Sequence, residues 1–150
     1  MENDLKQQNS FFRFEDLRVY HKAVDYAVWV QEHKSTFTEQ GTVLQKKIEE
    51  QAYEIALQIS DGSSQNKNNF VHCLKSAKSS VRNCVVLSDI ARRSGLFSEE
   101  QFNEGYEVLM ELTKMLGALI TSLQRGSNNR SDKAKNQDDL SLDGDMDFQY

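Results

Sequence analysis

The chain has 150 residues, which corresponds to one domain that can bury a hydrophobic core without disulfides or a metal ion. It contains no proline and seven glycines, and this scarcity of turn-forming residues argues against a β-rich fold and favours long helices. The formal net charge of −5 does not suggest a strongly nucleic-acid-binding chain, although such an average can hide a local basic patch.

Membrane and secretion signals are missing from the sequence. No stretch is apolar enough for a transmembrane helix, which needs about 20 such residues. The first residues, Met1 to Lys6, are polar and lack the apolar core of a signal peptide. We therefore expect no membrane partner and a cytoplasmic location. We divide the chain into a flexible segment (1–12), a helical bundle (13–125) and a disordered acidic tail (126–150).

A first helix is predicted from Glu15 to His33, because acidic residues favour a helix start. It has apolar residues on two roughly opposite faces. One face contains Leu17, Tyr20, Val24, Ala27 and Val28. The other contains Val19, Ala23, Tyr26 and Val30. Because a surface helix of a monomer needs only one apolar face, we assign the second face to an oligomer interface.

A second helix is predicted from Val43 to Ile59. Its apolar stripe consists of Leu44, Ile48, Ala52, Ile55 and Ile59. Five small or polar residues from Ser60 to Ser64 then break the helix, with Gly62 as a candidate for a left-handed cap.

A third helix is predicted from Lys67 to Ser94, followed by Gly95 beyond its last turn. Its core face consists of Phe70, Leu74, Ala77, Val81, Cys84 and Ala91. Val86 and Ile90 lie on the far side and are assigned to the same oligomer interface. Cys73 and Cys84 lie roughly 16 Å apart along such a helix, too far for a disulfide, so we interpret both as small buried apolar residues.

A fourth helix is predicted to begin at Ser98, because Ser98 and Gln101 have the spacing of a capping box. It runs to Gln124, and Gly126 ends it. Its apolar stripe consists of Phe102, Tyr106, Leu109, Leu112, Leu116, Leu119, Ile120 and Leu123. Four long helices with short connections predict an all-α, antiparallel, up-down-up-down four-helix bundle.

Basic residues gather on the third helix. Between residues 65 and 94 there is one acidic residue, Asp89, and there are six basic ones, namely Lys67, Lys75, Lys78, Arg82, Arg92 and Arg93. The first four fall within a sector of roughly 80° on a helical wheel. This arrangement suits a stripe that follows a phosphate backbone. The alternative is a solvated face offset by acidic residues of the fourth helix, which are Glu99, Glu100, Glu104, Glu107 and Glu111.

The tail alternates apolar with polar or acidic residues from Leu140 to Tyr150. Such a segment can dock on a partner, or cover the basic stripe of its own chain, in an extended form. Plain disorder is the alternative.

Side chains that would support an enzyme are not arranged for catalysis. His21, His33 and His72 fall on different predicted helices or faces. The sequence has no phosphate-binding glycine loop, no nucleophile elbow and no Glu-x-x-His pair of a di-iron bundle. We therefore predict a non-enzymatic protein with no metal site, no catalytic residues and no cofactor.

Three segments resemble one known family. The stretch from Phe14 to Ala23 (FEDLRVYHKA) resembles the opening signature of the 23S rRNA intervening-sequence proteins, also called the S23 or four-helix-bundle protein family. The stretch from Ile59 to Ser63 (ISDGS) resembles the Ile-Ala-Glu-Gly turn that ends the second helix of that family. The stretch from Gly95 to Phe102 (GLFSEEQF) is similar to its third junction. The resemblance covers the predicted bundle from Phe12 to Gln124.

The resemblance implies an antiparallel four-helix bundle that forms a homopentameric ring. It also brings in a relative, the accessory variability determinant of diversity-generating retroelements, which binds a reverse transcriptase and its RNA. Two features depart from the family: the stretch from Tyr53 to Gln58 lacks a proline common in the family, and the chain is acidic whereas the retroelement proteins are basic.

These observations predict a homo-oligomeric helical scaffold that binds RNA, DNA or a nucleoprotein through the third helix. The alternative is a protein-interaction module, such as a reverse-transcriptase accessory subunit, with the acidic tail as its docking segment.

Overall fold

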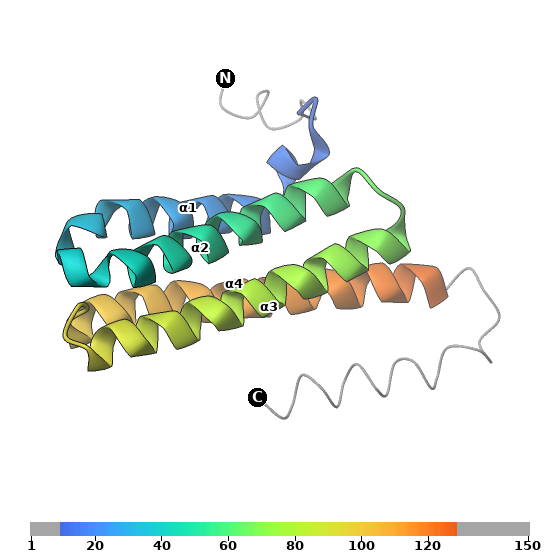
Figure 1. Ribbon diagram of the computed structural model, residues 1–150. Coiled ribbons are helices and arrows are strands. Elements are labelled where there is room, and N and C mark those ends of the chain that lie inside the picture. The colour runs from blue at the N-terminus through green and yellow to red at the C-terminus, as the bar shows by residue number, and fades with distance from the viewer. Residues whose placement is uncertain (1–9, 129–150) are drawn as a thin grey trace, which may run out of the picture.

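The computed structural model describes residues 10–128, and within that range the chain forms four α-helices and no strand (Figure 1). The helices are α1 (Arg18–Glu32), α2 (Thr42–Ser63), α3 (Lys67–Arg93) and α4 (Glu99–Asn128). Short 3-10 helices precede α1 (Arg13–Asp16) and join α1 to α2 (Lys34–Thr36 and Glu39–Gly41). The prediction of an all-α four-helix bundle is confirmed for this part of the chain.

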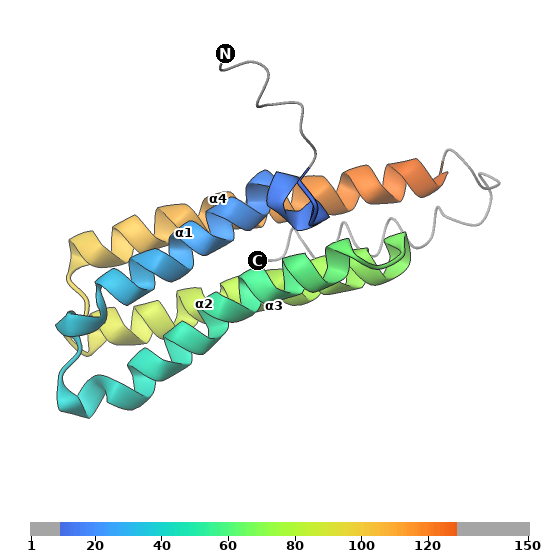
Figure 2. The same cartoon turned by 90° about the horizontal axis from the view of Figure 1, so that it is seen from above.

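The four helices pack into a bundle in which each helix contacts two neighbours. Helix α2 packs most extensively against α3, and further contacts join α3 to α4, α1 to α2 and α1 to α4. Figure 1 shows the α1–α2 and α3–α4 connections at one end and the α2–α3 connection at the other, and Figure 2 shows α1 beside α4 from above. The outer side of each helix therefore faces away from the other three.

The core follows from the helical spacing of apolar residues. Its largest fully buried side chains are Tyr26, Ile48, Ile55, Ile59, Leu74, Val81, Cys84, Leu109, Leu112 and Leu116. Burial of one large apolar side chain contributes about 1.5–3 kcal/mol, so these residues dominate the stability of the bundle. Cys73 and Cys84 are buried free thiols, as the sequence predicted.

Helix α1 begins later than the sequence suggested. Glu15 and Asp16 lie in the preceding 3-10 helix, and Leu17 has an extended backbone (φ −88°, ψ 121°) that separates this helix from α1. Phe14 packs against Tyr20, with ring centroids 4.8 Å apart, and thereby ties the 3-10 helix to α1. The two acidic residues therefore do not form the first turn of α1.

We predicted that Gly62 caps α2 in a left-handed conformation. This prediction is wrong. Gly62 lies inside the helix, and among the described residues only Gly95 has a positive φ. A Cβ added at Gly62 would lie 2.7 Å from Cys73 Cβ and 2.9 Å from Phe70 Cδ1. The missing side chain of Gly62 is therefore what lets α3 approach α2 closely.

The α3–α4 junction follows the sequence prediction. Gly95 has a φ of 76°, which suits the glycine just beyond a helix. The Gln101 backbone N–H donates to Ser98 Oγ (3.1 Å), and the Ser98 N–H donates to Gln101 Oε1 (2.9 Å). This is the reciprocal geometry of a capping box. Gly126, in contrast, does not end α4, which continues to Asn128.

Candidate nucleic-acid interface

Helix α3 presents basic side chains on the side that faces away from the core. Its inner side is fixed by buried residues, which are Phe70, Leu74, Ala77, Val81 and Cys84. Lys67, Lys75 and Arg82 are exposed, and Lys78 is half-buried at the edge of the same side. We call these four cations, Lys67, Lys75, Lys78 and Arg82, the α3 basic face.

The α3 basic face is long and free of acidic residues. The distance along the axis from Lys67 to Arg82 is about 22 Å at the rise of an α-helix. No Asp or Glu occurs in α3 before Asp89. Lys75, Lys78 and Arg82 each already take part in a contact of their own. A phosphate group that binds here would therefore replace existing contacts rather than meet bare cations.

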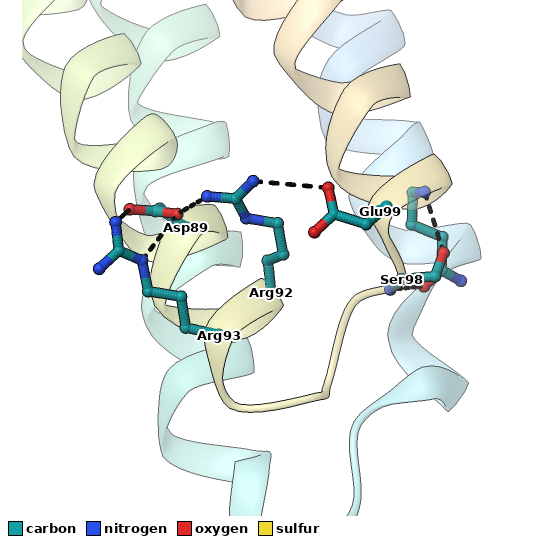
Figure 3. Close-up of polar contacts among 6 residues, drawn as sticks. Asp89, Arg92, Arg93, Ser98 and Glu99 are labelled. Carbon is teal, nitrogen blue, oxygen red and sulfur yellow. Dashed lines mark hydrogen bonds and ion pairs between the residues drawn. The ribbon is translucent and has the colours of Figure 1, made fainter.

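Arg92 and Arg93 pair with Asp89 inside α3, and Arg92 also reaches across the α3–α4 junction. Arg92 Nη2 lies 2.6 Å from Asp89 Oδ1, and Arg93 Nη2 lies 3.3 Å from Asp89 Oδ2 (Figure 3). Arg92 also lies 3.5 Å from Glu99, and its guanidinium carbon lies 4.3 Å from the centre of the Phe102 ring. The hydrogen bond from Arg92 lowers the pKa of Asp89. The role of both arginines in binding nucleic acid stays a prediction, and we do not count them in the α3 basic face.

Two acidic residues of α4 contact α1. Glu111 forms an ion pair with Lys22 of α1 at 2.5 Å, and the hydrogen bond from Lys22 lowers the pKa of Glu111. Glu104 accepts a hydrogen bond from Trp29 Nε1 of α1 at 3.3 Å. These two carboxylates are thus used on the side of α4 that faces α1, and Glu99 is used by Arg92. Glu99 thus pairs with one of the six basic residues of α3, as the alternative to a binding stripe expects, whereas Glu104 and Glu111 contact α1.

Four residues predicted for the oligomer interface lie in the core of the single chain. Val19, Ala23, Tyr26 and Val30 have exposed fractions of 5%, 0%, 0% and 3%. This face of α1 packs against the other helices of its own bundle, so the prediction was wrong for these four. The other two predicted residues, Val86 and Ile90, are exposed at 58% and 46%.

The structure shows an apolar surface on α1 and α2 that sequence reasoning missed. Gln31 of α1 donates a hydrogen bond to the Tyr53 hydroxyl of α2, which brings the outer sides of the two helices together. The exposed apolar residues on this side are Phe11, Phe12, Val28, Tyr53 and Leu57, and we call them the α1–α2 apolar patch. The run of three aromatic residues within positions 11–14 was a signal for it, but we had placed residues 1–12 in a flexible segment.

A groove lies at one end of the α1–α2 apolar patch. It has a volume of about 690 Å³. Its lining includes Phe11, Phe12, Arg13 and Leu57, together with Asp61. The groove is therefore apolar along much of its wall and has both a cation and a carboxylate at its edge.

A second apolar surface lies where α2 begins and α3 ends. Val43, Val86 and Ile90 are exposed there, and we call them the α2–α3 apolar patch. Gln51 of α2 accepts a hydrogen bond from Asn83 of α3 at 2.9 Å, which aligns the two helices so that Val43 lies near the C-terminal end of α3. Val43 and Leu57, one from each patch, both belong to α2 and lie about 21 Å apart along it.

The remaining predictions concern a metal site, a membrane-spanning helix and the docking segment. The first two can be examined only within residues 10–128. Within that range no group of three or more His, Cys, Asp or Glu side chains is placed to hold a metal ion. None of the helices in the described range is long and apolar enough to cross a membrane. The predicted docking segment from Leu140 to Tyr150 lies outside the described residues.

Comparisons with known proteins agree with the resemblance seen in the sequence. Among curated proteins there is no significant match. A crystal structure of a protein of unknown function from the S23 ribosomal protein family of Bacteroides thetaiotaomicron VPI-5482 has a similar fold, with a TM-score of 0.64 and 19% sequence identity. The similarity covers 69% of this chain and 95% of that one. The profile of the 23S rRNA-intervening sequence protein family matches residues 15–118, from the first 3-10 helix into α4. The chain belongs to the 23S rRNA-intervening sequence protein family.

Proposed function

We propose that this chain is a non-enzymatic, homo-oligomeric helical scaffold that binds nucleic acid or a nucleoprotein through the α3 basic face. The observation that carries the proposal is the row of four cations on the outer side of α3, with no acidic residue on that helix before Asp89. Double-stranded nucleic acid carries one charge per about 1.7 Å, so a row of about 22 Å spans many phosphates. Binding then depends on this local surface and not on the net charge of the chain.

The scaffold that we propose is an antiparallel, up-down-up-down bundle assembled into a ring, with five subunits as the family resemblance implies. A closed ring larger than a dimer is built from head-to-tail contacts, and each subunit then needs two different complementary surfaces. The α1–α2 apolar patch and the α2–α3 apolar patch supply two such surfaces. Repetition of the α3 basic face around the ring would multiply its affinity for a long polyanion.

The test of nucleic-acid binding reverses two charges on the α3 basic face. We expect Lys75→Glu with Arg82→Glu to abolish retention of a labelled single-stranded RNA, because two phosphate contacts are replaced by repulsion. The matched control is Lys46→Glu with Lys47→Glu, which makes the same change in net charge at exposed positions of α2. Light scattering checks that both variants keep the assembly of the wild type. Equal RNA binding by the two double variants would rule out the α3 basic face.

A second candidate function is a protein-interaction module, such as a reverse-transcriptase accessory subunit. The groove between the N-terminal segment and α2 favours it, because exposed aromatic side chains beside a groove suit a protein partner. Deletion of residues 138–150 separates the candidates. It should reduce capture of a protein partner if the tail is a docking segment, and it should not reduce binding of RNA.

A further inference from the structure

The end of α4 lies beside the first cation of the α3 basic face. A Cβ added at Gly126 would lie 3.1 Å from Lys67 Nζ. Figure 1 shows the C-terminal end of α4 and the N-terminal end of α3 at the same end of the bundle. Residues 129–150 lie outside the described residues, and the chain enters them from Asn128, two residues beyond this contact. The segment after α4 is therefore tethered next to the α3 basic face.

The charges of the two segments are opposite. Residues 136–150 contain no Lys or Arg and five aspartates, namely Asp138, Asp139, Asp143, Asp145 and Asp147. Residues 67–88 contain four Lys or Arg and no Asp or Glu. Two rows of charge as uniform as these attract one another over about 8 Å at physiological ionic strength, the Debye length under those conditions.

The tether is long enough for the two rows to meet. The ten peptide units between Asn128 and Asp138 reach about 33–36 Å when extended, and a flexible chain of that length has a mean span of about 17 Å. The α3 basic face is about 22 Å long. A tether of this length keeps the segment that it carries at an effective concentration in the millimolar range, so even weak pairing is populated.

We propose that the aspartate-rich segment of residues 136–150 docks on the α3 basic face of its own chain and competes there with nucleic acid. The inhibitory part of this proposal rests on the proposed function, whereas the docking itself does not. The segment presents carboxylates to the same cations that would otherwise bind phosphates. It therefore sets a threshold that only a long or highly charged polyanion overcomes.

The first experiment neutralises the segment in the full-length chain. All five of its aspartates are changed to asparagine, and the affinity for a labelled single-stranded RNA of 20 nucleotides is measured by fluorescence anisotropy. We expect binding about 10-fold tighter than that of the wild type. The matched control neutralises five exposed acidic residues of the bundle that lie off α3, by Asp25→Asn, Glu32→Gln, Glu50→Gln, Glu100→Gln and Glu107→Gln. The control has the same net charge and should gain less than about 3-fold.

The second experiment measures docking without nucleic acid. A fluorescent synthetic peptide of residues 136–150 is titrated with the full-length chain whose own five aspartates are neutralised. We expect saturable binding that added salt weakens, that is lost when the peptide carries the five asparagines, and that is lost when the protein also carries Lys75→Glu and Arg82→Glu.

The outcomes separate this proposal from the proposed function. If the tail variant and the control bind RNA equally and the peptide does not bind, the docking proposal is overturned while RNA binding stands. If the peptide binds but no variant binds RNA, the docking is supported and the nucleic-acid function fails. If neither RNA nor peptide binds, both are overturned.

Discussion

Two helical glycines show how one atom decides the packing of this bundle. At Gly62 a Cβ would lie within 3 Å of Cys73 and Phe70 on the facing helix, whereas a Cβ at Gly117 would meet nothing within 4 Å. From the sequence alone, Gly62 resembled a helix stop, because glycine often follows the last turn of a helix. The facing residues that require a glycine here belong to α3, and no local pattern reveals them.

We expect the two glycines to respond in opposite ways to alanine. Gly62→Ala should lower the free energy of unfolding by about 1–3 kcal/mol, since α2 and α3 must move apart. Gly117→Ala should raise it by up to about 1 kcal/mol, because alanine favours the helix and has room. Urea unfolding followed by far-UV circular dichroism measures both changes. A Gly62→Ala variant as stable as the wild type would show that the helices are not in such close contact.

The thiol of Cys84 is a further case in which the environment of a residue sets its chemistry. Burial raises the pKa of Cys84 from 9.0 to about 12, because the thiolate would lose its hydration in the core. The folded state therefore keeps this proton at pH values where the unfolded chain releases it. Its contribution to stability is complete below pH 9 and is lost as the pH rises toward 12.

This linkage predicts a stability loss in mild alkali. Between pH 8 and pH 10 the Cys84 thiol should remove about 1.4 kcal/mol from the free energy of unfolding, since each pH unit above the unfolded pKa is worth about 1.4 kcal/mol. Cys84→Ala should show a correspondingly smaller loss over the same range. Urea titrations of both proteins at the two pH values provide the comparison, and equal pH dependence would contradict the effect of burial.

At the scale of the element, the local signals at the α3–α4 junction were reliable, whereas Glu15, Gly62 and Gly126 did not mark helix ends as predicted. The boundaries of α3 and the start of α4 agree with the sequence, because Gly95 and the Ser98–Gln101 capping box act within a few residues. The two apolar faces of α1 were found, but the face that meets its own bundle was assigned to a partner. Helical periodicity shows that a face is apolar and cannot show which helix covers it.

The capping box gives an element-scale prediction. Ser98→Ala should lower the free energy of unfolding by about 1 kcal/mol, because the backbone N–H of Gln101 loses its acceptor. Ser122→Ala changes the same side chain at an exposed position inside α4 and should alter stability by less than about 0.5 kcal/mol. Urea unfolding compares the two variants. An equal effect of both substitutions would mean that the cap contributes nothing.

At the scale of the whole molecule, two groups of exposed apolar residues, one near each end of α2, are the basis for assembly. Patches of this kind are expected when a contact runs from one surface of a subunit to another surface of the next. The sequence assigned only Val86 and Ile90 of these residues to an interface and placed Val28 on an apolar face without naming what covers it. Phe12, Val43 and Leu57 become neighbours of other exposed residues only in the folded chain.

Light scattering tests this assembly. The wild type should have a multiple of the chain mass of 17.3 kDa, five-fold if the ring has five subunits. Val28→Glu with Leu57→Glu, or Val86→Glu with Ile90→Glu, should each give a monomer, because one half of every contact is charged. A mixture of these two variants keeps one intact contact and should form a heterodimer.

The control for assembly places the same added charge on the outer side of α4. Ala118→Glu with Thr121→Glu changes two exposed positions away from both patches and should leave the mass of the assembly unchanged. A wild-type chain that stays at 17.3 kDa in concentrated solution would contradict the ring.

The salt dependence of RNA affinity tests the central claim most directly. If the four cations of the α3 basic face contact phosphates, a logarithmic plot of the association constant against salt concentration should have a slope of about −3 for single-stranded RNA. Lys75→Glu with Arg82→Glu should remove the binding, while Lys46→Glu with Lys47→Glu should keep the slope. Salt-insensitive affinity, or no binding at 50 mM salt by either the wild type or the variant with a neutralised tail, would contradict a nucleic-acid function for this protein.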